Sequence, residues 1–249
     1  MSRVAIVLSM TSTLPAVAQT TPADTNAGRW IMPGDSLLRG ARVTTGTSRY
    51  LLTAYKDGDE FNVGRIQDQI SVDTVDGAAR LVRVQRLERG TQRVIDSTWT
   101  DCATLTPRRH RSEQPQRRIG IDFIGKKIKA TIGQPGAVPA VIDTTLKLPV
   151  FDSGNWDLLL RALPLEKGLR VRFLVYDTDA GVHEYRLAVT GTAQILGEEA
   201  FIVRFALSRT SEAYVWVSTA TRDFLQMETM VAGSTLLRQV RVREPSTGR

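Results

Sequence analysis

The sequence predicts a mainly β protein, a strongly curved antiparallel sheet or half-barrel with one short amphipathic helix on its concave face. Apolar and polar residues alternate in many short segments, as at Phe201, Val203 and Phe205, which is typical of strands with one buried face. Turn sequences such as Asp76-Gly77 separate these segments at about ten-residue spacing, as in antiparallel meanders. Helical periodicity is clear in one segment.

Size and composition favour one domain with a real core. The chain has 249 residues, of which 42% are hydrophobic and 24% charged, and this excludes wholesale disorder, collagen and coiled coils. Strand patterns fall into two sets, over residues 42–148 and 169–243, with no long linker between them. We therefore expect a single β domain over residues 42–243 and a short tail over 244–249.

The N-terminus has the layout of a secretory signal peptide. Arg3 precedes an apolar stretch, and Ala16-Val17-Ala18 supplies a small-x-small cleavage site. The prediction is a signal peptide over residues 1–18, cleaved after Ala18, and a flexible polar leader over 19–41; the alternative is a frayed cytosolic N-terminus. Because the residue directly after the cleavage site is not a cysteine, we expect a soluble periplasmic protein without a lipid anchor.

The helical segment lies between the two sets of strands. Its apolar residues recur at i, i+3, i+4 and i+7, giving one apolar stripe. These residues are Trp156, Leu159, Leu160 and Leu163. Asp152 or Ser153 can cap the start and Pro164 ends the segment, so we expect a helix over about 153–163 on the apolar face of the sheet.

A twisted sheet of this size curls, and its concave face must be filled by side chains or enclose a cavity. The aromatic and leucine side chains of the helix and of the later strands are the candidates for a ligand-binding lining. They are Trp156, Leu160, Leu163, Phe173, Phe201 and Phe205. The alternative is that these side chains form plain core.

Three segments carry a family resemblance. They are Thr104-Leu105-Thr106-Pro107, the stretch from Asn155-Trp156-Asp157 to Leu163-Pro164-Leu165, and residues 191–205. Together they resemble a bacterial exported family of unknown function that is similar in fold to the periplasmic outer-membrane lipoprotein carriers, which are unclosed antiparallel barrels with helices inside. The resemblance implies an envelope location and an apolar ligand and supplies no catalytic residues. This chain shows one helix where the carriers have several.

Motifs for catalysis or metal binding are absent from the sequence. His110 and His183 are the two histidines, and neither has a paired-ligand spacing. Common hydrolase and nucleotide-binding motifs are missing, the single Cys102 reads as an inert thiol, and Asp177-Thr178-Asp179 reads as a hairpin turn. We expect no catalysis, no cofactor and no metal, the alternative being an enzyme built from scattered Asp, Arg and Tyr residues.

The charge distribution has one sharp feature. The chain carries 33 basic and 26 acidic residues, a net charge of +7, and five arginines gather where residues 104–112 and 117–124 are expected to pair as a hairpin around Pro115. These are Arg108, Arg109, Arg111, Arg117 and Arg118. They fit contact with an anionic surface or head group or, alternatively, a solvated sheet edge. With 6% aromatic residues and no stacking platform, nucleic acid is not an expected partner.

Together these features predict a non-catalytic, monomeric periplasmic protein that binds an apolar or amphipathic, lipid-like ligand between sheet and helix. The alternative is a structural or adaptor protein of the cell envelope, with a filled core and a basic interaction hairpin that contacts another envelope protein.

Overall fold

The structure is a computed structural model that describes residues 28–208, 211–231 and 235–242. The predicted signal peptide over 1–18, residues 19–27 and the predicted tail over 244–249 lie outside the described residues.

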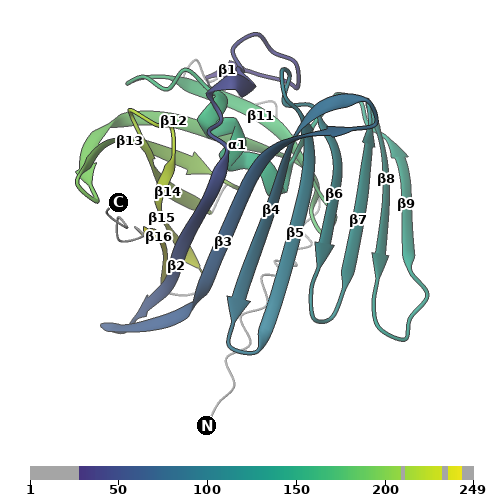
Figure 1. The fold of residues 1–249 in the computed structure, drawn as a ribbon, viewed down its shortest axis with the longest axis horizontal. Helices are drawn as coiled ribbons and strands as arrows, with labels where there is room; N and C mark the ends of the chain where they lie inside the picture. The colour runs from purple at the N-terminus through teal and green to yellow at the C-terminus, as the bar shows by residue number, and fades with distance from the viewer. Residues whose placement is uncertain (1–27, 209–210, 232–234, 243–249) are drawn as a thin grey trace, which may run out of the picture.

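One large, strongly curved sheet makes up most of the described chain (Figure 1). Its first set of strands is β2 (Gly46–Lys56), β3 (Asp59–Val75), β4 (Ala78–Arg89), β5 (Gln92–Asp101), β6 (Pro107–Glu113), β7 (Arg118–Ile124), β8 (Lys127–Gly133) and β9 (Ala140–Thr145). Its second set is β11 (Arg170–Asp177), β12 (Gly181–Ile195), β13 (Glu198–Ala206), β14 (Glu212–Ser218), β15 (Phe224–Val231) and β16 (Thr235–Val242).

The two sets join through the antiparallel pairing of β16 with β2. The strand order therefore runs from β11 through β16, then β2, and on to β9. Two short strands, β1 (Arg29–Trp30) and β10 (Phe151–Asp152), pair in parallel with β11. The sheet is thus mixed, because these two short strands are parallel to their neighbour. Within each set, consecutive strands pair antiparallel and form a meander, as the turn spacing predicts.

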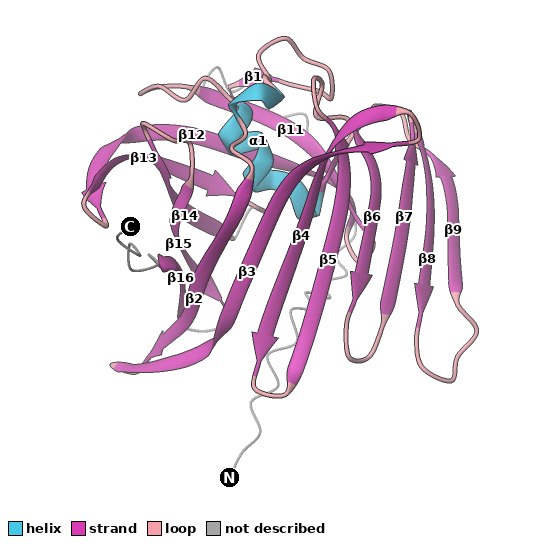
Figure 2. Cartoon of the chain, viewed as in Figure 1, coloured by secondary structure: helices cyan, strands magenta, loops and turns pink. Residues whose placement is uncertain are grey.

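The predicted helix is confirmed on the concave face. α1 (Trp156–Ala162) follows a 3-10 turn, η2 (Ser153–Asn155), and lies inside the curve of the sheet (Figure 2). The carboxylate of Asp152 accepts a hydrogen bond from the Gly154 amide and so caps the turn. Leu160 and Leu163 are fully buried in the main core, to which both sets of strands contribute.

The expectation of a flexible leader over 19–41 is wrong for its described part. Arg29–Trp30 pairs with β11, Ile31 and Leu38 are buried in the main core, and the Arg39 amide donates to the Ala162 carbonyl at the end of α1. These two apolar anchors hold the segment on the core, and its 3-10 turn η1 (Gly40–Arg42) packs against α1.

The two ends of the sheet overlap without closing a barrel. Val171, Phe173 and Val175 of β11 face the main core, whereas Tyr176 faces a second cluster formed mainly by β7 and β8. Phe123 and Tyr176 meet edge to face in this cluster, with ring centroids 6.4 Å apart. Since β11 does not pair with β7 or β8, side chains rather than backbone hydrogen bonds join the ends.

Candidate functional site

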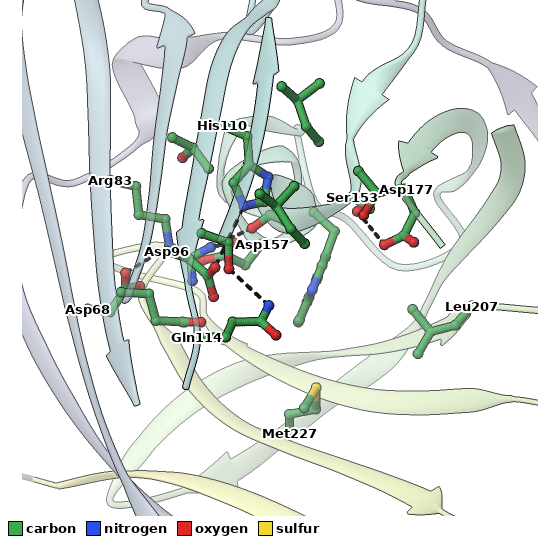
Figure 3. Close-up of a pocket in the computed structure, with 18 of the residues that line it drawn as sticks. Asp68, Arg83, Asp96, His110, Gln114, Ser153, Asp157, Asp177, Leu207 and Met227 are labelled. Atoms are coloured by element: carbon green, nitrogen blue, oxygen red, sulfur yellow. Dashed lines mark hydrogen bonds and ion pairs between the residues drawn. The ribbon is translucent and has the colours of Figure 1, made fainter. Parts of the chain in front are cut away.

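A pocket of about 440 Å³ opens on the concave face beside the first turn of the helix (Figure 3). Side chains from β2 to β7, from η2 and α1, and from the second set of strands line it. Strands far apart in the sequence therefore build one site, and the curvature of the sheet brings them together.

Polar side chains occupy inward positions on β3 to β6 and form one wall of the pocket. Asp68, Gln85, Asp96 and Ser112 are successive cross-strand partners in one row. The next row contains Arg83, Thr98 and His110. Because strand alternation sends these side chains to the buried face, they need partners or a polar ligand.

Arg83 is the centre of a buried charge network. Its Nε donates to Asp68 Oδ1 at 2.7 Å, and its Nη1 lies 2.9 Å from Asp157 Oδ1 and 2.7 Å from the Gly154 carbonyl oxygen. Burial lowers the pKa of Arg83, but Asp157 and Asp68 raise it more, so the net shift is upward. Arg161 of α1 lies within 4 Å of both carboxylates. The network fixes the start of the helix to β3 and β4.

His110 lies between two carboxylates. Its Nδ1 is 3.0 Å from Asp152 Oδ1 and its Nε2 is 3.7 Å from Asp96 Oδ1. Burial lowers the pKa of His110, but Asp152 and Asp96 outweigh burial and raise that pKa to about 10. The ring is therefore an imidazolium at neutral pH, and Nδ1 donates to Asp152. In this state it cannot serve as a general base.

The outer part of the pocket lies between two hairpin turns. Asp177, at the end of β11, accepts hydrogen bonds from the Ser153 hydroxyl and from the amides of Asp179 and Ala180. Both Asp179 oxygens pair with Arg117, at 2.9 and 3.0 Å. Residues 177–180 thus form the predicted hairpin turn, and the Arg117 bridge ties it to the β6–β7 turn.

The opposite wall of the pocket is apolar and aromatic. Trp156 stacks on Phe205, with ring centroids 5.1 Å apart, and meets Phe224 at 6.0 Å. The remaining apolar and aromatic lining residues are Tyr50, Ile119, Ile121, Tyr185, Leu207 and Met227. Burial, then Asp177 and Asp152, raise the pKa of Tyr185 to about 12. The site is amphipathic, with charges on one side and rings on the other.

The structure brings one of the six predicted ligand-binding residues to this pocket. Trp156 lines it. Leu160, Leu163, Phe173 and Phe205 are fully buried in the main core. Phe201 packs at the edge of the core beneath the guanidinium of Arg222. Ligand contact by these six residues stays a prediction.

The predicted hairpin of β6 and β7 is present, and four of its five arginines lie within 4 Å of a carboxylate. Arg109 and Arg111 pair with Asp122 on the outer face of the sheet. Arg117 pairs with Asp179, and Arg108 lies 3.8 Å from Asp101. Arg118 is exposed. Contact of this patch with an anionic surface stays a prediction, and its positive charge is only partly compensated, because Arg109 and Arg111 share Asp122.

Sequence reasoning missed the polar wall. The sequence signal for this wall was the presence of polar residues at strand positions whose side chains point to the buried face. Arg83 and Gln85 interrupt the series of inward apolar residues between Leu81 and Leu87. Only the pairing register shows that such interruptions on four strands lie side by side. Cys102, by contrast, is half-buried, and burial, followed by Asp101, raises its pKa, which fits an unreactive thiol.

Comparison with known proteins places this chain in a family. A family described as "Protein of unknown function (DUF3108)" matches residues 49–239. The chain belongs to the DUF3108 family. This membership confirms the predicted resemblance to a family of unknown function. No curated protein matches the sequence.

Two solved structures are matched to the DUF3108 chain. A beta-barrel-like protein of domain of unknown function DUF1849 from Brucella abortus superposes with a TM-score of 0.55 at 11% identity, covering 83% of this chain and 98% of that one. A LolA superfamily protein from Nitrosomonas europaea is matched at a TM-score of 0.23 and 10% identity, covering 86% and 93%. The first likeness supports the fold.

Two further findings concern the described residues of the DUF3108 chain. No group of three or more His, Cys, Asp or Glu side chains among them is arranged to hold a metal ion. Within the same residues, no helix has the length and apolar character needed to cross a membrane.

Proposed function

We propose that this protein is a non-catalytic periplasmic binding protein that holds an amphipathic, lipid-like ligand in the pocket of the concave face. The observation that carries the proposal is the pocket itself, which is about 440 Å³ in volume and has a charged wall facing an aromatic one. Ligand pockets in proteins are commonly a few hundred Å³ and combine apolar walls with a few placed polar groups.

The packing of the helix defines where the ligand lies. From Leu158 to Leu163 the helix is buried against its neighbours, so it leaves no room for a chain between itself and the sheet. Trp156 and Asp157, in its first turn, face the pocket. We therefore place the ligand beside the start of the helix rather than along its length, and the volume suits one short chain or ring system.

A carrier role fits the site better than catalysis does. His110 is held as an imidazolium by Asp152 and Asp96, and the Ser153 hydroxyl donates to the carboxylate of Asp177. Neither arrangement is a serine–histidine pair, in which a neutral imidazole beside the hydroxyl accepts its proton. The alternative of an adaptor with a filled core is disfavoured by the pocket.

The location is proposed from the N-terminal sequence, in which the small-x-small site ends at Ala18. Periplasmic extraction followed by intact-mass measurement tests it. A mature protein that begins at Gln19 supports export, and an uncleaved protein that stays in the cytoplasm contradicts it.

Ligand binding is tested by native mass spectrometry of protein purified from the periplasm and by titration with N-phenyl-1-naphthylamine, a neutral fluorescent amphiphile. We expect co-purified small amphiphiles and saturable fluorescence. Met227→Trp places a large ring at the pocket wall and should abolish the fluorescence.

Met230→Trp is the matched control, because Met230 lies on the same strand as Met227 and its side chain is about half exposed outside the pocket. This variant should bind the probe as the wild type does. If the wild type binds neither probe nor co-purified amphiphile, or if both variants bind alike, ligand binding in this pocket is refuted.

A further inference from the structure

The charges around the pocket fall into three groups, and the first of them is balanced. Arg83 and Arg161 face Asp68 and Asp157, two cations for two carboxylates. Both carboxylates are almost fully buried, with side chains 2% and 6% exposed. This group leaves no net charge for a ligand.

The second group has an excess carboxylate. His110 is one cation between Asp152 and Asp96, so two carboxylates face one positive ring. Asp152 makes the short contact, and Asp96 stands 3.7 Å from a ring nitrogen that has no hydrogen-bond partner among the described residues. The Asp96 side chain is 34% exposed and lines the pocket. Burial raises its pKa, but His110, the Ser112 hydroxyl and Arg83 outweigh burial and lower it, so Asp96 is an accessible carboxylate.

The third group has a second excess carboxylate. Arg117 pairs with both oxygens of Asp179, and Asp177 accepts hydrogen bonds from the Ser153 hydroxyl and from two backbone amides. One cation again faces two carboxylates. Asp177 lines the pocket together with Asp96.

The pocket thus has acidic character in a chain whose overall charge is +7. Its lining cations are Arg83, His110 and Arg117, each already facing carboxylates. A ligand with an anionic head would meet two groups that each have one carboxylate in excess of their cation, in a partly enclosed site where charges are weakly screened.

We infer that the pocket selects amphiphiles with a cationic head, a primary or quaternary ammonium, which binds at Asp96 and Asp177 while the apolar part packs on Trp156 and Met227. This inference rests on the proposed function and specifies its ligand class. Tyr185, whose pKa is raised by burial and then by Asp177, lines the same pocket, and aromatic faces attract ammonium groups.

The test is isothermal titration calorimetry at pH 7.5 with three ligands of equal chain length: decyltrimethylammonium, N,N-dimethyldecylamine N-oxide and decanoate. They carry a positive, a net neutral and a negative head. We expect the cation to bind at least about tenfold more tightly than decanoate, the N-oxide to lie between them, and added salt to weaken the cation most.

Asp96→Asn removes the charge and keeps the shape. It should lower the affinity for the cation about tenfold, the size expected of one charge-assisted contact, and change the N-oxide affinity little. Asp177→Asn supplies a second variant, since its amide oxygen can still accept the turn hydrogen bonds. Asp122→Asn is the charge-matched control, because Asp122 pairs with arginines on the outer face.

Decanoate binding as tightly as the cation, or a cation preference unchanged in both Asp96→Asn and Asp177→Asn, overturns the inference. If N-phenyl-1-naphthylamine still binds in the pocket in that case, the proposed function survives without it. If the probe and all three decyl ligands fail to bind, both fail.

Discussion

At the residue scale, His110 shows how neighbours decide what a side chain does. A histidine exposed to water is mostly neutral at pH 7, but here the Asp152 and Asp96 carboxylates hold its proton. The ring therefore acts as a fixed cation that joins β6 to the turn before α1.

This arrangement predicts a pH dependence of stability. The folded pKa of His110 is raised from 6.5 to about 10, so its stabilisation is complete below about pH 6.5 and is lost as the pH rises through about 10. We expect the free energy of unfolding, measured with urea, to fall between pH 7 and pH 10 by at most about 1.4 kcal/mol per pH unit from this group.

His110→Gln isolates that contribution, because lysine and tyrosine side chains titrate in both proteins. The variant should show the shallower decline over this window. Parallel pH profiles for the two proteins would contradict a raised pKa at His110.

Arg83 gives a second prediction at this scale. Arg83→Met leaves Asp68 and Asp157 buried without their main partner, which we expect to cost about 3–5 kcal/mol in the free energy of unfolding. Arg86→Met, on the outer face of the same strand, should cost less than about 0.5 kcal/mol. Urea unfolding measures both, and equal losses would show that the buried network does not stabilise the fold.

At the scale of the element, α1 is a seven-residue helix too short to be stable alone, so packing must hold it. Leu160 is fully buried in the main core, and the segment with Ile31 and Leu38 covers the end of the helix, where the Arg39 amide donates to the Ala162 carbonyl. The apolar stripe of the helix was predictable from the sequence. The packing of residues 28–38 on the core was not, because their apolar residues are scattered and show neither helical nor strand periodicity.

Leu160→Ala should therefore loosen the helix and cost about 2–5 kcal/mol, since it removes a buried side chain and leaves a cavity. Leu160→Met keeps the volume and should cost less than about 1.5 kcal/mol. Thermal unfolding checks the pair, and a Leu160→Ala cost no larger than that of Leu160→Met would mean that the helix is not held by this contact.

At the scale of the whole molecule, the overlap of the sheet ends encloses the outer part of the pocket. Two kinds of contact join these ends: the second apolar cluster, containing Phe123 and Tyr176, and the half-exposed Arg117–Asp179 bridge. Buried apolar contacts contribute far more to stability than exposed ion pairs, so the cluster should hold the ends together.

Phe123→Ala is expected to cost about 3–5 kcal/mol, whereas Arg117→Ala should cost less than about 1 kcal/mol. Hydrogen exchange of β7 and β8 should accelerate in the first variant and stay near the wild-type rate in the second. The reverse order would assign the joining of the ends to the salt bridge.

The sequence by itself determined the local structure of this protein. Period-two alternation fixed the strands, turn residues such as Asp76-Gly77 fixed the meander, and the spacing from Trp156 to Leu163 fixed the helix, because each is a property of neighbours along the chain. It also indicated that the concave face would be lined by apolar side chains, four of which prove to be core.

The tertiary structure alone decided the site. Asp68, Arg83, Asp96 and His110 are separated by many residues, and each alone is an unremarkable polar residue in a strand. Their convergence depends on the pairing register across four strands and on the curl that brings β11 against β7. Those are long-range relations, and the side-chain periodicity of a single strand does not encode them.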